Sequence, residues 1–101
     1  MQEVKVLNTS PALEIALSGE IDSKNVDEFE SEVLTAYRSA RCDVVFDCSD
    51  LSFIDSTTLG AFVKIFKHVR EDGHSMKLKR TQPRIKKLFV ICALDAIMEI
   101  E

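Results

Sequence analysis

The stretch from Leu51 to Phe66 constrains the fold more than any other part of this sequence. A mainly apolar run, Leu51–Ile54, ends at Asp55, three hydroxyl residues follow, and an amphipathic segment then begins. A side-chain oxygen of Asp55 or Ser56 can accept hydrogen bonds from the unpaired N–H groups of a first helical turn. Such a helix start is partly positive, so a phosphate could be accepted here without unfolding the chain. On the local pattern alone, ordinary helix capping is the simpler interpretation.

The N-terminal part of the chain predicts a β-hairpin. Residues 3–7 and 13–18 alternate apolar with polar or small residues, which is the period of a half-buried strand. Asn8–Pro11, between them, has the composition of a turn. We therefore expect two antiparallel strands at the start of the sequence.

Three later segments have the apolar spacing of amphipathic helices, at about residues 25–39, 56–71 and 83–94. Asn25, followed three residues later by Glu28, fits a capping box at the first helix. Asp72-Gly73 is a stop signal for the second helix, and a proline opens the third. The expected buried stripes are Val26, Phe29, Val33, Tyr37 and Ala40, then Leu59, Phe62, Val63, Phe66 and Val69, then Ile85, Leu88, Phe89 and Cys92.

The remaining apolar segments predict further strands. Val44–Phe46 reads as a short strand buried on both faces and therefore central in a sheet. Residues 75–79 alternate, with lysines typical of a strand near a sheet edge, and residues 96–100 fit a short final strand. Helices alternating with strands predict an α/β fold, a mostly parallel sheet with an antiparallel N-terminal hairpin. The length suits a single domain over residues 1–101.

Several motifs of this chain resemble those of one family. Leu51–Gly60 resembles the D-S-[ST]-G-L-G core of the STAS domain, in particular of bacterial anti-sigma-factor antagonists. Gly19–Asp22 resembles the G-E-[LI]-D turn of the family, Asp72-Gly73 falls at its glycine pair, and Thr81–Phe89 resembles its last helix. Thr58 stands where most members have glycine, a departure that bears on partner choice. The resemblance covers nearly the whole chain and implies a STAS-like fold.

The resemblance also implies a function, a phosphorylation switch at Ser56. Unphosphorylated protein would bind an anti-sigma factor that is also a serine kinase, and so free a sigma factor. The kinase, with ATP, would phosphorylate Ser56 and end the binding, and a PP2C-type serine phosphatase would reverse this. The protein would be a kinase substrate rather than an enzyme, with no cofactor and no metal. The expected partner surface comprises Asp22, Ser23, Asp55, Ser56, Thr57, Thr58 and Gly60.

Other classes of function stay open at this point. A STAS-like domain can be a non-phosphorylated scaffold subunit of a signalling or transport complex. The acids Glu20, Asp22, Asp47, Asp50 and Asp55 suggest a Mg²⁺ site or a phosphoacceptor aspartate, but turn and capping roles account for most of them. An enzyme is the weakest alternative, because the sequence contains no nucleophile elbow and no glycine-rich phosphate loop.

Charge and composition limit the partners and the compartment. Residues 1–60 hold 12 acidic and 4 basic residues, whereas residues 61–101 hold 5 and 9, for a net charge of −4. An acidic chain without tryptophan argues against nucleic-acid binding, and its basic part suits a solvated face or an acidic partner.

Apolar runs are too short for a membrane span, and the start lacks signal-peptide features. Three cysteines, Cys42, Cys48 and Cys92, suit a reducing compartment as core residues. We expect a cytoplasmic protein, monomeric when free.

Overall fold

Five strands form one sheet in the order β1-β2-β3-β4-β5 in the computed structural model, which describes residues 2–101. β1 and β2 are antiparallel, and each later pair of neighbours is parallel. The predicted hairpin, the mostly parallel sheet and the α/β fold are therefore confirmed. The strands are β1 (Gln2–Asn8), β2 (Leu13–Ile21), β3 (Val44–Ile54), β4 (Met76–Lys79) and β5 (Glu99–Ile100); the helices are α1 (Val26–Ala40), α2 (Ser56–Glu71), α3 (Pro83–Ile91) and the 3-10 helix η1 (Leu94–Ala96).

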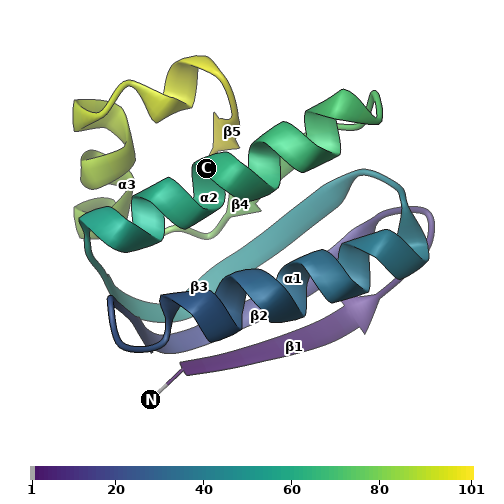
Figure 1. Ribbon diagram of the computed structural model, residues 1–101. Helices are drawn as coiled ribbons and strands as arrows, with labels where there is room; N and C mark the ends of the chain where they lie inside the picture. Colours follow the sequence, from purple (N-terminus) through teal and green to yellow (C-terminus); the bar gives the residue numbers. More distant parts are fainter. Residues whose placement is uncertain (1) are drawn as a thin grey trace.

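A cluster of aromatic rings fixes α2 against the rest of the molecule. α1 and α2 lie side by side across one face of the sheet, with α3 near the start of α2 (Figure 1). The buried Phe62 ring of α2 lies 5.2 Å from Phe29 of α1, 5.4 Å from Phe46 of β3 and 5.4 Å from Phe89 of α3, measured between ring centroids. Large buried rings dominate the packing of a small core. The position of the α2 N-terminus is thereby set from three sides.

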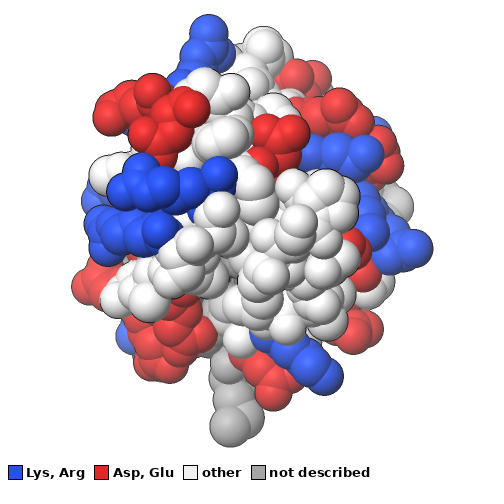
Figure 2. Space-filling model, turned by 90° about the vertical axis from the view of Figure 1, so that its right-hand side faces the viewer, with Lys and Arg blue, Asp and Glu red and all other residues white. Residues whose placement is uncertain are grey.

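Polar contacts join α1 and α2 at their C-terminal ends. The Tyr37 hydroxyl donates to the Asp72 carboxylate across 2.7 Å, and Arg41 pairs with the same carboxylate at 3.2 Å. Burial, reinforced by the bond to Asp72, raises the pKa of Tyr37 to about 12. As predicted, α2 stops at Asp72-Gly73, where Gly73 has a φ of 80°. Figure 2 turns this end of the molecule to the viewer: acidic and basic side chains lie next to one another around a neutral centre.

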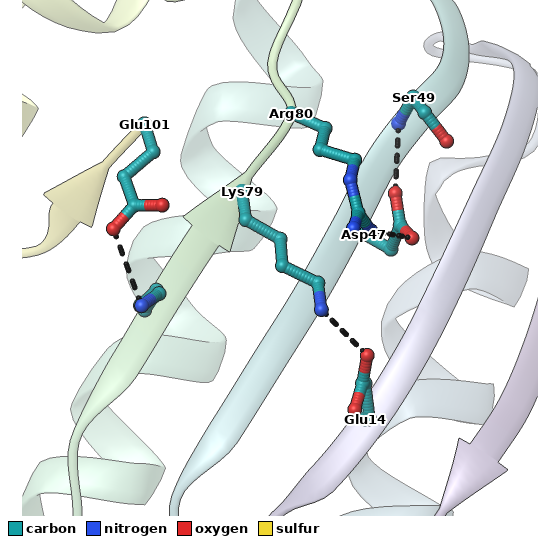
Figure 3. Close-up of polar contacts among 7 residues, drawn as sticks. Glu14, Asp47, Ser49, Lys79, Arg80 and Glu101 are labelled. Atoms are coloured by element: carbon teal, nitrogen blue, oxygen red, sulfur yellow. Dashed lines mark hydrogen bonds and ion pairs between the residues drawn. The ribbon is translucent and has the colours of Figure 1, made fainter.

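The sheet face turned away from α1 and α2 carries charged pairs (Figure 3). Lys79 of β4 reaches across to Glu14 of β2 at 2.7 Å, and Arg80 pairs with Asp47 of β3 at 2.9 Å. Partial burial would raise the pKa of Asp47, but the Ser49 N–H and the Arg80 guanidinium outweigh it and hold that pKa below its ordinary value. Glu14 and Asp47 are therefore both paired with basic side chains. Asp47 is bound by Arg80 on this face of the sheet and does not lie with the acidic residues at the strand ends.

Two local predictions near the first helix and the central strand were wrong. Asn25 does not form a capping box with Glu28: its side chain accepts from the Asp22 N–H and donates to the Glu20 carbonyl, both at 2.9 Å, and so closes the preceding turn. β3 does not end near Phe46 but continues to Ile54, because its polar middle still pairs with β2. Its central place in the sheet is confirmed, although Val45 is only half-buried rather than buried.

The third helix is shorter than predicted. α3 ends at Ile91 instead of residue 94, and η1 follows after a residue in the left-handed region, Ala93 with φ of 58°. Within its expected stripe, Ile85 and Phe89 are buried and Leu88 is half-buried. Cys92 falls beyond the helix and is exposed, so its assignment to the core was wrong; Cys48 is buried and Cys42 intermediate.

Candidate functional site

The predicted site residues come together where β2 and β3 end and α1 and α2 begin, at the left of Figure 1. In the parallel register, Ile21 of β2 is the partner of Ile54 of β3. The residues that follow them, Asp22 and Asp55, therefore leave the sheet next to one another. Parallel neighbours thus bring residues 22–23 and 55–60 to one edge of the molecule.

Asp55 caps α2, as one of the two residues expected to do so. Its Oδ1 accepts from the Thr58 N–H at 3.1 Å and from the Thr57 hydroxyl at 2.6 Å. In return the Thr58 hydroxyl accepts from the Asp55 N–H at 3.3 Å, which completes a capping box. The Thr57 hydroxyl, together with the Thr58 and Ser23 N–H groups, holds the pKa of the Asp55 carboxyl below its ordinary value. The carboxylate is therefore charged at neutral pH.

The second oxygen of Asp55 binds the neighbouring loop. Oδ2 accepts from the Ser23 N–H at 3.0 Å. Asp22 shapes the same loop, since its Oδ1 accepts from the Lys24 N–H at 2.9 Å and its carbonyl accepts from the Asn25 N–H at 3.1 Å. Both acids thus have structural hydrogen bonds of the Asx-turn and helix-cap kinds.

The three consecutive hydroxyls have three different environments. The Ser56 side chain is exposed at the first position of α2, and within residues 2–101 its hydroxyl has no hydrogen-bond partner. Thr57 is also exposed, but its hydroxyl is committed to Asp55. Thr58 is fully buried, and its hydroxyl donates to the Ile21 carbonyl. Ser56 is therefore the hydroxyl of the three that a second protein can reach unhindered.

Thr58 does not belong to the exposed surface on which it was predicted. Its exposed fraction is 0%, because it lies four residues before Phe62 on the buried stripe of α2. Its hydroxyl contacts the Ile21 carbonyl and the Asp55 N–H from the buried side of the helix cap. The four-residue spacing from Thr58 to Phe62 could have indicated in the sequence that Thr58 is buried.

A groove beside Ser56 runs between α1 and α2. It has a volume of about 350 Å³ and is lined by Val26, Asp27, Glu30, Thr57, Gly60, Ala61 and Lys64. Gly60 is exposed, and a Cβ built there would meet nothing within 4 Å. A glycine in a helix interior costs about 1 kcal/mol relative to alanine, so the fold itself gives no reason for this one.

A second groove, on the other side of the strand ends, was missed by the sequence interpretation. It has a volume of about 610 Å³ and is lined by Glu20, Ser52, Phe53, Ile54, Arg84, Ile85 and Leu88. Phe53 is 47% exposed although it belongs to an apolar run. Leu51 and Ile54 are both buried and the two residues between them are exposed, so strict strand alternation did not indicate that Phe53 faces outward.

The acids do not gather around a common point. In the part of the chain that the structure describes, no three His, Cys, Asp or Glu side chains are grouped as a metal site requires. Likewise, no helix within residues 2–101 is long and apolar enough to cross a membrane.

One family model and several curated proteins match this chain. The family model of the STAS domain matches residues 3–101. The anti-sigma-B factor antagonist of Bacillus subtilis (strain 168) is 33% identical over 97 residues, which cover 96% of this chain and 88% of that protein.

Solved structures give the same fold. The anti-sigma factor antagonist SpoIIAA in its unphosphorylated form has a TM-score of 0.75 at 19% identity, covering 100% of this chain and 87% of that one. The phosphorylated form of the Bacillus cell fate determinant SpoIIAA has a TM-score of 0.69 at 19% identity, covering 100% and 91%. At such identities the likeness concerns the fold alone.

Proposed function

The chain belongs to the STAS domain family, and we propose that it acts as an anti-sigma-factor antagonist. In its unphosphorylated form it binds an anti-sigma factor that is also a serine kinase, and this binding frees a sigma factor. The kinase ends the binding by phosphorylating Ser56, and a PP2C-type serine phosphatase restores it. The protein is then a kinase substrate rather than an enzyme, and residues 1–101 form a single STAS domain.

The observation that carries this proposal is the free hydroxyl of Ser56. It is exposed at the start of α2, whereas the Thr57 hydroxyl is bound to Asp55 and Thr58 is buried. A kinase needs a hydroxyl that can enter its active site without breaking the substrate fold. Ser56 meets that requirement, and the relatives in the family support the partner class.

A phosphate at Ser56 would act through charge rather than through unfolding. It adds about −1.5 to −2 charges. The cap position of α2 is already taken by Asp55, whose carboxylate accepts the Thr58 N–H. The phosphate would therefore meet a charged Asp55, with Asp22 on the adjoining loop, and would remain poorly compensated beneath a docked partner. Every tenfold loss of affinity requires only about 1.4 kcal/mol.

The proposed partner surface surrounds Ser56. It consists of the exposed or half-buried Asp22, Ser23, Asp55, Ser56, Thr57 and Gly60, with Thr58 as an internal support instead of a contact. Gly60 would allow close approach of the partner to α2 at the open groove.

Substitution of Ser56 tests the proposal. Ser56→Ala should bind the anti-sigma factor as the parent does but take up no phosphate, and Ser56→Asp should fold normally and bind more weakly. Thr57→Ala is the matched control, since it removes a neighbouring hydroxyl and leaves Ser56 available. Equal binding by the parent and Ser56→Asp, together with no phosphate on the parent, would favour a non-phosphorylated scaffold subunit instead.

A further inference from the structure

The groove formed by Phe53 and Arg84 has features that the fold alone does not require. It lies between the end of β3 and α3, where the exposed Phe53 and the half-buried Leu88 supply apolar surface beside the almost fully buried Ile54 and Ile85. Phe53, at its edge, is 47% exposed, so its ring offers apolar surface that a side chain of another molecule could cover. Its volume of about 610 Å³ can hold an apolar side chain from another molecule.

Arg84 lies at a position where a positive charge is unfavourable for helix stability. It lies in the first turn of α3, directly after Pro83, and that turn contains no acidic residue. A positive charge at a helix N-terminus opposes the helix dipole, where an acid would be favoured. Among residues 2–101, Arg84 takes part in none of the ion pairs, and Glu20 on the opposite side of the groove does not pair with it. The guanidinium is therefore available to an external carboxylate.

The groove adjoins the Ser56 site through two shared segments. Phe53 lies two residues before Asp55 on β3, and Glu20 lies two residues before Asp22 on β2. Glu20 and Phe53 are also partners in the parallel register. A protein that covers Ser56 from the strand ends would thus reach the groove without a second, separate contact.

We propose that this groove is an anchoring site for the same anti-sigma factor, which inserts an apolar side chain against Phe53 and places a carboxylate on Arg84. The inference rests on the proposed function and adds the chemistry of the partner at a site beside Ser56. Buried aromatic and arginine contacts carry much of the binding free energy of protein interfaces. Contacts in the groove supply binding affinity, while phosphorylation of Ser56 controls the release of the partner.

Two variants, Arg84→Glu and Phe53→Ala, test the anchor. In Arg84→Glu, stability and binding should change in different directions. Arg84→Glu should leave the melting temperature unchanged or raise it, because an acid suits the first turn of α3. It should nevertheless weaken binding by about tenfold or more, as should Phe53→Ala. Lys86→Glu is the matched control: it makes the same charge change on α3 but lies outside the groove, so its affinity should stay within about twofold of the parent.

The measurement is the dissociation constant of each unphosphorylated variant by titration calorimetry. The probe is the anti-sigma factor encoded in the same genome, with the anti-sigma-B factor of Bacillus subtilis as a second probe, and sedimentation velocity is run on each protein alone. Binding by the parent with unchanged affinity in both Phe53→Ala and Arg84→Glu overturns the anchor alone. An equal loss in Lys86→Glu, or a parent that self-associates through Phe53, also overturns it. Absence of binding by the parent overturns the proposed function and the anchor together.

Discussion

The carboxylate of Asp55 accepts a hydrogen bond from the backbone N–H of Ser23, 32 residues earlier in the chain, across 3.0 Å. The same carboxylate caps α2 through the Thr58 N–H. One side chain therefore holds the Ser23 loop against the start of α2, where Ser56 lies. At the far end of the helix pair, Tyr37 and Asp72 make the corresponding connection at 2.7 Å. The surface around Ser56 is thus fixed before any partner arrives, which limits the ordering cost of binding.

Asp55→Asn should lower the free energy of unfolding by about 1–2 kcal/mol at neutral pH. An amide has a single oxygen, so its NH₂ group would face the Ser23 N–H and one of the two connections would be lost. Urea unfolding of the variant and the parent measures the difference. Asp50→Asn, an exposed acid with no side-chain hydrogen bond among the described residues, is the control and should change little.

The effect of Asp55→Asn should also depend on pH in a defined direction. The folded-state pKa of Asp55 is depressed, so its contribution to stability is complete above the unfolded-state value and is lost as the pH falls through the folded-state pKa. The difference between variant and parent should therefore shrink below about pH 4. A difference that stays constant down to strong acid would contradict the assigned hydrogen bonds.

Thr58→Val should destabilise the fold by about 1–3 kcal/mol, because a buried acceptor and donor lose their shared hydroxyl partner at nearly constant side-chain volume. The two groups are the Ile21 carbonyl and the Asp55 N–H. Thr58→Ser, which keeps the hydroxyl, should lose less. Chemical denaturation compares them with Thr57→Val at the exposed neighbouring position. If Thr57→Val lost more free energy of unfolding than Thr58→Val, the buried hydrogen bonds of the Thr58 hydroxyl would not have the stabilising role assigned to them.

Gly60→Ala should raise the free energy of unfolding by up to about 1 kcal/mol, since α2 gains helix propensity and the added Cβ meets no neighbour within 4 Å. If the partner approaches α2 closely, the same methyl group should weaken its binding. Thermal unfolding and calorimetric binding check the two signs together. Lys67→Ala, near the other end of α2, is the control for binding. Unchanged affinity in Gly60→Ala would remove this position from the partner surface.

Cys92 should be the first of the three thiols to react with a disulfide reagent under native conditions. It is exposed, whereas Cys48 is buried, and burial, with the nearby Asp47 charge, raises the pKa of Cys48 to about 12. A thiol must ionise to react, so Cys48 should remain protected until the protein unfolds. Time-resolved absorbance of the released thiolate follows the reaction, and Cys92→Ser should remove its fast phase. Persistence of that phase would place the reactive thiol elsewhere.

The periodic spacing of apolar residues was enough to predict the main strands and helices and the arrangement of the sheet. The hairpin, the helices over about 25–39 and 56–71, and the central place of the strand at Val44 follow from local alternation and helical spacing, and the structure confirms them. The polar Asp47, Ser49 and Asp50 resemble a turn in sequence, so the continuation of β3 past Phe46 was not predicted. Their strand conformation depends on pairing with β2, which is a long-range contact.

The site was predictable as a set of segments but not in its internal geometry. Asp55 was expected to cap α2, and it does. Asn25 is an equally good cap by residue type, yet its side chain closes a turn with Glu20 instead. The choice between such local hydrogen bonds depends on the path of the preceding strand. Thr58 was placed on the partner surface by the resemblance to the family motif, although its spacing from Phe62 indicated burial.

The most direct test is the intact mass of the protein after incubation with the cognate anti-sigma kinase and ATP, followed by peptide mapping. The expected result is a gain of one phosphate, located on Ser56, in the parent and in Thr57→Ala, and none in Ser56→Ala. Phosphate on Thr57, or equal phosphorylation of Ser56→Ala, would contradict the assignment of the switch residue. No modification by a kinase that is active on another substrate would contradict the switch itself.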